Sequence, residues 1–206
     1  MKRARAVLLI HGILVLLETI ALIHDIRVFG AGMLQYYTID SNVLQLIVSA
    51  GILICLLRLG KSPVWLIVLH LVCAVCLTIT FLIAAFVLAP QEGFAYYFLS
   101  NVAPINHFLG PVLSVAAFIF TQVEAVLPRR VALAPMAFTL IYGICVLLLN
   151  IARVLDGPYF FLRVYEVPVS TVVMWFVIIA VLCLVFSALY MWLRRTVRAR
   201  RSRPQT

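Results

Sequence analysis

Residues 64–89 read VWLIVLHLVCAVCLTITFLIAAFVLA, and this stretch contains no charged side chain. A helix needs about 20 apolar residues to cross the hydrocarbon core of a bilayer, so the stretch is long enough to span it. Its apolar residues run on without the polar–apolar alternation of a barrel strand. In hydrocarbon, only helices and closed barrels satisfy every backbone hydrogen bond. The stretch therefore predicts a transmembrane helix.

The rest of the chain has the same apolar character. Of its 206 residues, 66% are hydrophobic and 11% are charged, and the mean hydropathy is +1.17. A soluble domain has about half apolar and about a quarter charged residues, so this composition indicates a membrane protein. The apolar runs predict an all-α bundle of six transmembrane helices with a basic tail at 194–206. The helices are expected over residues 6–24, 39–58, 64–89, 103–126, 131–153 and 168–193.

The basic residues indicate the orientation of the bundle. The net charge is +9, and all but three of the 16 Lys and Arg residues lie in the N-terminus, in loops 58–63 and 127–130, or in the tail. Basic loops favour the cytoplasmic side, so both termini are predicted to be cytoplasmic. We expect the tail to contact anionic lipid headgroups and no part of the chain to bind nucleic acid. The preference for Arg over Lys indicates a GC-rich bacterium. The expected location is therefore a bacterial plasma membrane.

A polar stripe marks the second predicted helix. Thr38, Ser41, Asn42, Gln45 and Ser49 follow one another at helical spacing and therefore share one face. Polar groups in hydrocarbon are costly and usually face the interior of a bundle. By the predicted topology, the stripe runs from the outer end of this helix toward the middle of the membrane.

The fourth predicted helix begins with a second polar group, Asn106 and His107. Pro111 lacks an N–H, so the carbonyl of His107 loses its usual partner and a distortion of the helix is expected there. The second and fourth helices both start at the outer face, which places Thr38 and His107 at similar depth. A hydroxyl, an imidazole and free N–H groups at helix N-termini are the components of acyl transfer. Taken singly, Thr38 also fits a helix cap.

Further polar residues complete a candidate outer site. We expect substrate-binding or oxyanion-stabilising roles among Ser41, Asn42, Gln45, Asn106, Asn150 and Arg153. Arg153 is suited to a carboxylate headgroup or to pairing with Asp156. Glu18, the deepest acid of the first helix, is expected to pair within the bundle. No compact ligand spacing predicts a metal, and no cofactor is expected.

Two motifs resemble a known family. The segments YYTIDSN (36–42) and INHFLGPVL (105–113) resemble the androgen-induced protein family and its bacterial predicted six-helix relatives. The loop DGPYFF (156–161) is similar to a Gly-x-Tyr-Pro-Phe segment of that family. The resemblance implies a membrane threonine hydrolase that acts on fatty acid esters of hydroxy fatty acids. It implies Thr38 as the nucleophile and His107 as its general base, with a membrane lipid as substrate.

Two other functions remain open. The polar stripe is also compatible with a transporter or binding protein for lipids or small molecules, although no inverted repeat is visible. The four histidines fall into two layers, His11 with His70 and His24 with His107, which resembles the plan of a di-haem cytochrome b561. That plan requires each pair to converge on one iron.

Overall fold

The computed structural model describes residues 2–121 and 126–202, and every regular element in these ranges is helical. The elements are α1 (Lys2–Phe29), the 3₁₀ helix η1 (Gly30–Gln35), α2 (Tyr37–Leu59), α3 (Val64–Ile83), the π-helix η2 (Ala84–Leu88), α4 (Ala89–Glu92), α5 (Phe94–Phe98), the π-helix η3 (Ile105–Leu109), α6 (Gly110–Phe120), the 3₁₀ helix η4 (Arg129–Leu133), α7 (Ala134–Ile151), the 3₁₀ helix η5 (Phe160–Leu162) and α8 (Val169–Arg201). The predicted all-α class is confirmed.

Five of the described helical segments are long and apolar enough to cross a membrane. They cover Arg5–Gln35, Tyr37–Leu59, Val64–Glu92, Arg129–Ile151 and Val169–Arg201. A shorter apolar helix, Ile105–Phe120, occupies the described part of the predicted span 103–126, whose residues 122–125 lie outside the described ranges. The chain is therefore a multi-pass helical bundle by the length and composition of its helices.

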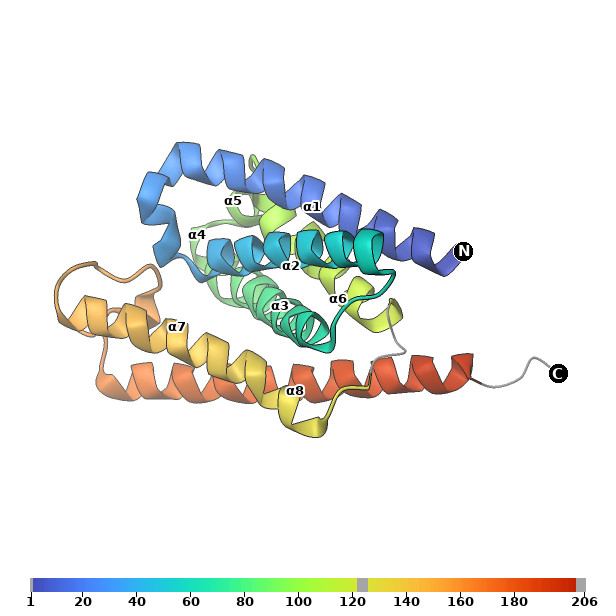
Figure 1. Cartoon of the computed structure of the whole chain (residues 1–206). Coiled ribbons are helices and arrows are strands. Elements are labelled where there is room, and N and C mark those ends of the chain that lie inside the picture. The colour runs from blue at the N-terminus through green and yellow to red at the C-terminus, as the bar shows by residue number, and fades with distance from the viewer. Residues whose placement is uncertain (1, 122–125, 203–206) are drawn as a thin grey trace.

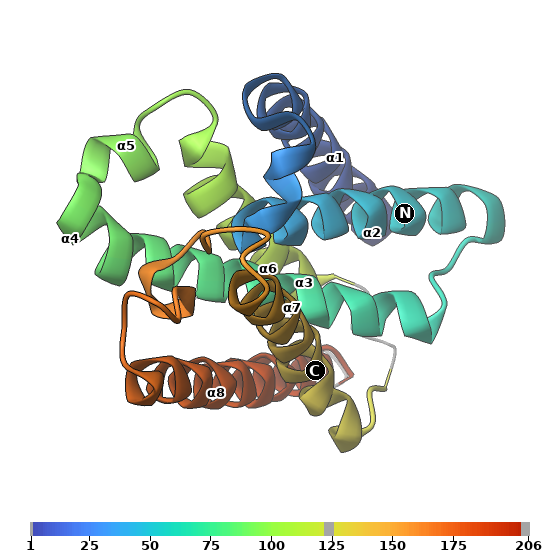
Figure 2. The same ribbon diagram turned by 90° about the vertical axis from the view of Figure 1, so that its left-hand side faces the viewer.

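Helix α3 forms the centre of the bundle. It packs against α2, α6, α7 and α8, and all its residues from His70 to Thr80 are buried (Figure 2). The surrounding helices instead expose large apolar side chains, such as Leu9, Ile47 and Leu57. An apolar surface of this extent needs a nonpolar environment, which lipid provides. The central part of the stretch 64–89, from His70 to Thr80, is thus the buried core of the fold.

The connections sort into two ends of the bundle. The start of α1, the loop between α2 and α3 and the end of α8 lie at one end (Figure 1). The 3₁₀ helix η1 and the loop between α7 and α8 lie at the opposite end. The first end carries most of the basic residues that the sequence groups together.

Helices α1 and α8, the first and the last of the chain, extend beyond their predicted spans. Helix α1 continues to Phe29 rather than ending near residue 24, and α8 continues through the predicted tail to Arg201. Arg194 is only 4% exposed, and its guanidinium donates to the carbonyl of Phe118 at 2.7 Å. Arg201 donates to the carbonyl of Phe120 at 2.9 Å. Carbonyls at a helix C-terminus lack partners within the helix, so the basic run caps the end of α6.

Candidate active site

Thr38 lies in the first turn of α2. The chain enters this helix from an extended Tyr36, and the first α-helical hydrogen bond joins the Asp40 N–H to the Tyr36 carbonyl. The N–H groups ahead of Asp40 in this turn therefore have no partner within the helix. They give the start of α2 a partial positive charge next to the Thr38 hydroxyl. This end of a helix favours negative charge that develops on a nearby oxygen.

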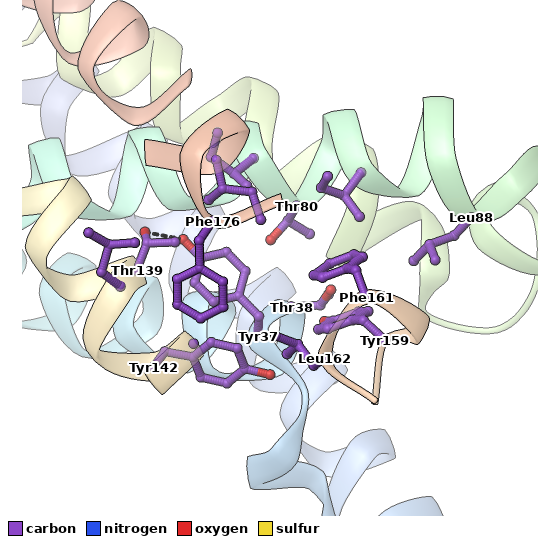
Figure 3. Close-up of a pocket in the computed structure, with 15 residues that line it drawn as sticks. Tyr37, Thr38, Thr80, Leu88, Thr139, Tyr142, Tyr159, Phe161, Leu162 and Phe176 are labelled. Atoms are coloured by element: carbon purple, nitrogen blue, oxygen red, sulfur yellow. Dashed lines mark hydrogen bonds between the residues drawn. The ribbon is translucent and has the colours of Figure 1, made fainter. Parts of the chain in front are cut away.

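Thr38 lines a cavity between α2, α3, α7, α8 and the loop before α8. Most of the wall of this cavity is aliphatic or aromatic (Figure 3). Its polar groups are hydroxyls, and they include those of Thr38, Thr80, Tyr142 and Tyr159. The lining residues are Tyr37, Thr38, Ile79, Thr80, Ile83, Leu88, Thr139, Leu140, Tyr142, Gly143, Tyr159, Phe161, Leu162, Phe176 and Ile179. A pocket with this lining suits a largely apolar ligand with one polar centre.

Tyr159 brings a second hydroxyl to Thr38. Its phenol lies beside Thr38 in the cavity wall and points at the backbone of Tyr37 and Thr38 (Figure 3). Burial raises the pKa of Tyr159 to about 12, and hydrogen bonding to Thr38 offsets part of that rise. Tyr159 is therefore neutral at physiological pH and keeps an O–H that can donate a hydrogen bond. Its ring is fixed by stacking on Phe161, with centroids 5.5 Å apart.

Asn150 and Arg153 organise the loop that carries Tyr159. The side chain of Asn150 donates to the Leu155 carbonyl at 3.0 Å and accepts from the Val164 N–H at 2.9 Å. Arg153 lies over the ring of Tyr165, 4.1 Å from its centroid. Neither residue lines the cavity, so the structure gives them supporting positions rather than contact with the space beside Thr38.

His107 lies in η3, outside the cavity wall. Its ring packs edge-on against Tyr97 and Phe98, with centroids 5.5 Å and 6.1 Å away. Among residues 2–121 and 126–202, no hydrogen bond joins Thr38 to His107, and the His107 Nδ1 has no partner. One amide still links their backbones: Asn42 Nδ2 lies 2.8 Å from the Thr38 carbonyl and 3.2 Å from that of Asn106. The structure thus makes the two segments neighbours without joining the two side chains.

The backbone around His107 departs from α-helical geometry, as Pro111 predicts. Residues Ile105–Leu109 form a π turn, in which the Gly110 N–H bonds to the Ile105 carbonyl five residues earlier. A wider turn accommodates a proline whose missing N–H would interrupt the normal ladder. The distortion is a local bulge that contains the histidine.

The remaining members of the polar stripe face other helices. The Gln45 side chain donates to Ser49 at 2.7 Å and accepts from Ser114 of α6 at 2.5 Å. Ser49 also lies 3.1 Å from the Nδ1 of His11 on α1. Ser41 donates to the Tyr37 carbonyl of its own helix at 2.7 Å. Thr38 alone in the stripe lines the cavity, so the stripe is divided between a site and contacts among helices.

The amides predicted to stabilise an oxyanion are held elsewhere. Asn42 donates to the two carbonyls described above, and Asn106 Nδ2 donates to Asp25 Oδ2 at 3.1 Å. The predicted pairing of Glu18 is also not seen, because neither of its carboxylate oxygens has a hydrogen-bond partner in the described part of the chain. Tyr159 is a residue of the site to which the sequence analysis assigned no role. Its only signal was the similarity of the 156–161 segment to a family motif.

The inner histidine pair does not fit a di-haem plan. The rings of His11 and His70 are in edge-on contact, with centroids 5.0 Å apart. Two axial histidines must lie on opposite faces of a macrocycle with the iron between them. Rings in mutual contact leave no space for that plane.

Comparison of the chain with known protein families, with curated proteins and with solved structures finds no match.

Proposed function

We propose that the protein is an intramembrane lipid ester hydrolase with Thr38 as its nucleophile, acting on esters of the fatty acid–hydroxy fatty acid type. The observation that carries this proposal is the position of the Thr38 hydroxyl. It lies at the N-terminus of a helix, in the wall of an apolar cavity and beside a neutral tyrosine. Such a cavity takes up acyl chains, and the helix end and phenol provide polar groups at one point of it.

The proposed reaction has two steps. The Thr38 oxygen attacks the ester carbonyl while its proton passes through water to the His107 imidazole, because no hydrogen bond joins the two side chains. An acyl-threonine forms as the alcohol leaves with that proton. Water then attacks the acyl-threonine and releases the fatty acid, which restores the threonine hydroxyl. Tyr159 and the N–H groups of the first turn of α2, which have no partner within the helix, stabilise the oxyanion in both steps. The Asn42 bridge between the two segments supports the role of His107.

The proposed topology has six membrane spans, with the helix Ile105–Phe120 as the fourth. Both termini are cytoplasmic, and the site faces the outer side of a bacterial plasma membrane. The grouping of basic residues at one end of the bundle supports this orientation, since basic loops favour the cytoplasm. The helix starts that carry Thr38 and His107 lie away from that end. Exposed arginines of α8, among them Arg195 and Arg198, are the proposed contacts for anionic headgroups.

A binding or transport function is the second candidate. The apolar wall of the cavity favours it equally, because an acyl chain can be held there without reaction. Turnover separates the two functions: a carrier binds the lipid ester and returns it unchanged, whereas a hydrolase releases the free acid.

The test uses purified protein, a fatty acid ester of a hydroxy fatty acid, and a fluorophosphonate probe that labels activated hydroxyl nucleophiles. We expect Thr38→Ala to abolish both hydrolysis and labelling, and His107→Ala to reduce both strongly. Thr19→Ala is the matched control, because the Thr19 hydroxyl donates to the Val15 carbonyl of its own helix at 2.6 Å. Full labelling of Thr38→Ala by the probe contradicts the assignment of Thr38 as the nucleophile. Loss in Thr38→Ala with full activity in His107→Ala contradicts the dyad alone.

A further inference from the structure

A second polar cluster lies between α1, α2 and η3, away from the cavity that Thr38 lines. It contains Glu18, Asn42 and Asn106, whose exposed fractions are 1%, 4% and 6%. Polar and charged groups at such depth require partners, because desolvation without compensation is costly. The cluster takes no direct part in the proposed steps of ester hydrolysis. Its one link to them is the Asn42 side chain, which joins the backbones of Thr38 and Asn106.

The cluster contains four buried acceptor oxygens without donors among the described residues. They are both carboxylate oxygens of Glu18 and the Oδ1 atoms of Asn42 and Asn106. The orientation of each amide is fixed by its nitrogen, since Asn42 Nδ2 reaches two carbonyls and Asn106 Nδ2 reaches Asp25. Turning either amide over would bring an oxygen against those acceptors. The oxygens therefore remain directed into the cluster.

Gly110 lies against three oxygens of this cluster. The position that a Cβ atom on Gly110 would occupy lies 2.6 Å from Glu18 Oε1, 3.0 Å from the Ile105 carbonyl oxygen and 3.1 Å from Asn42 Oδ1. Three oxygens from α1, α2 and η3 are thus gathered beside the backbone of Gly110, which has no side chain to separate them. The Ile105 carbonyl reaches it because η3 is a π turn.

The cluster contains two acidic side chains, and only one of them, Asp25, has a partner in the described part of the chain. Asp25 already contacts His24 at 3.3 Å and Asn106 at 3.1 Å. Glu18 has no hydrogen-bond or ion-pair partner in the described ranges. One proton on Glu18 would supply one donor and leave other acceptors without partners. A cation satisfies several oxygens at once, and carboxylate, amide and backbone carbonyl oxygens are ligands for hard cations.

We propose that Glu18, Asn42 and the Ile105 carbonyl, with Asn106 beside them, form a site for a monovalent cation, with Na⁺ as its ligand. The site combines an intramembrane acid with the carbonyl of an interrupted helix, an arrangement suited to Na⁺ within a membrane. Gly110 is required because any side chain there collides with the carboxylate. The existence of this site does not depend on the proposed hydrolase reaction or on its substrate.

Thermal unfolding of the purified protein in nanodiscs tests the site. NaCl is exchanged for KCl or N-methylglucamine chloride at constant ionic strength, so that general screening does not change. A ligand that binds only the folded state raises the unfolding midpoint with its concentration. We expect the midpoint to rise with Na⁺ in the wild type and to lose this dependence in Glu18→Gln. Asp156→Asn, an exposed carboxylate of the loop before α8, is the control and should keep the Na⁺ response.

Direct binding of ²²Na⁺ to the wild type in a scintillation proximity assay requires no variant. It therefore still tests the site if Glu18→Gln fails to fold. Binding that saturates and is not displaced by equal K⁺ supports the site. Absence of binding at millimolar Na⁺ overturns it. A carbonyl infrared band of a protonated carboxylic acid, present in Na⁺ and lost in Glu18→Gln, would also overturn it by showing that Glu18 carries a proton. Gly110→Ala should weaken ²²Na⁺ binding, and unchanged binding in that variant contradicts the geometry.

Discussion

Replacement of Tyr159 by Phe tests the proposed oxyanion donor. The phenol lies beside Thr38 and at the backbone N–H groups that begin α2, whereas the ring is held separately by stacking on Phe161. Tyr159→Phe therefore removes one donor and keeps the aromatic surface. Loss of one oxyanion-hole donor lowers kcat by about 100- to 1,000-fold, or about 2.7–4 kcal/mol of transition-state stabilisation. The loss in folding stability should be smaller, at about 1 kcal/mol for a single hydrogen bond.

The assay measures release of labelled fatty acid from a lipid ester by the purified protein over a range of substrate concentrations. Because the donor acts on charge that develops in the transition state, kcat should fall while KM stays nearly constant. Tyr142→Phe is the matched control. Tyr142 lines the same cavity, but its hydroxyl donates to the Gln35 carbonyl at 2.5 Å. We expect this control to lose some stability and little of its kcat.

Three results would refute the reasoning about Tyr159. An unchanged kcat in Tyr159→Phe would show that the phenol does not stabilise the oxyanion. A rise in KM with constant kcat would assign it to ground-state binding of the ester. An equal loss of kcat in Tyr142→Phe would show that any change in the cavity wall slows the reaction.

Two further predictions concern the cavity and pH. A Cβ atom on Gly143 would lie 3.1 Å from Phe176 Cζ, so Gly143→Leu should fill part of the cavity. The ratio of kcat/KM for p-nitrophenyl palmitate to that for p-nitrophenyl acetate should then fall by about tenfold or more. An unchanged ratio would place the acyl chain elsewhere. The pKa of Tyr159 rises from 10.0 to about 12 on burial, so its favourable contribution to stability is fully present below pH 10 and is lost as pH rises through about 12. Chemical denaturation between these pH values should show a loss of stability in the wild type that is smaller in Tyr159→Phe, and equal slopes would contradict the assignment.

The sequence predicted the helical membrane character because hydropathy acts through the length of each segment. The stretch at 64–89 contains no charge and became the buried centre of the bundle. The helix ends were less predictable, because a helix can continue beyond the hydrocarbon. Arg194 belongs to the predicted tail, yet it lies within α8 and its side chain caps the end of α6.

The candidate site was predicted only in part, for a similar physical reason. Periodicity places Thr38 at the start of a helix and at the head of a polar stripe, but it does not say which neighbour each member faces. That choice depends on how α1, α3 and α6 pack around α2. Tyr159 lies in a loop without periodicity, and the hydrogen bonds of Asn150 shape that loop. No pattern local to residue 159 carries that information.

Asn42 connects the two proposed sites, because its amide has one end at each. The nitrogen donates to the carbonyls of Thr38 and Asn106, and the oxygen lies beside Gly110, as Glu18 Oε1 does. A cation bound to that oxygen would restrain the amide, and the amide in turn would fix the first turn of α2 against the π turn that contains His107. The relative position of nucleophile and proposed base would then depend on occupancy of the cation site, although no ligand of that site lines the cavity. Such coupling acts on the geometry of the reacting groups and leaves the apolar wall that binds the acyl chain unchanged.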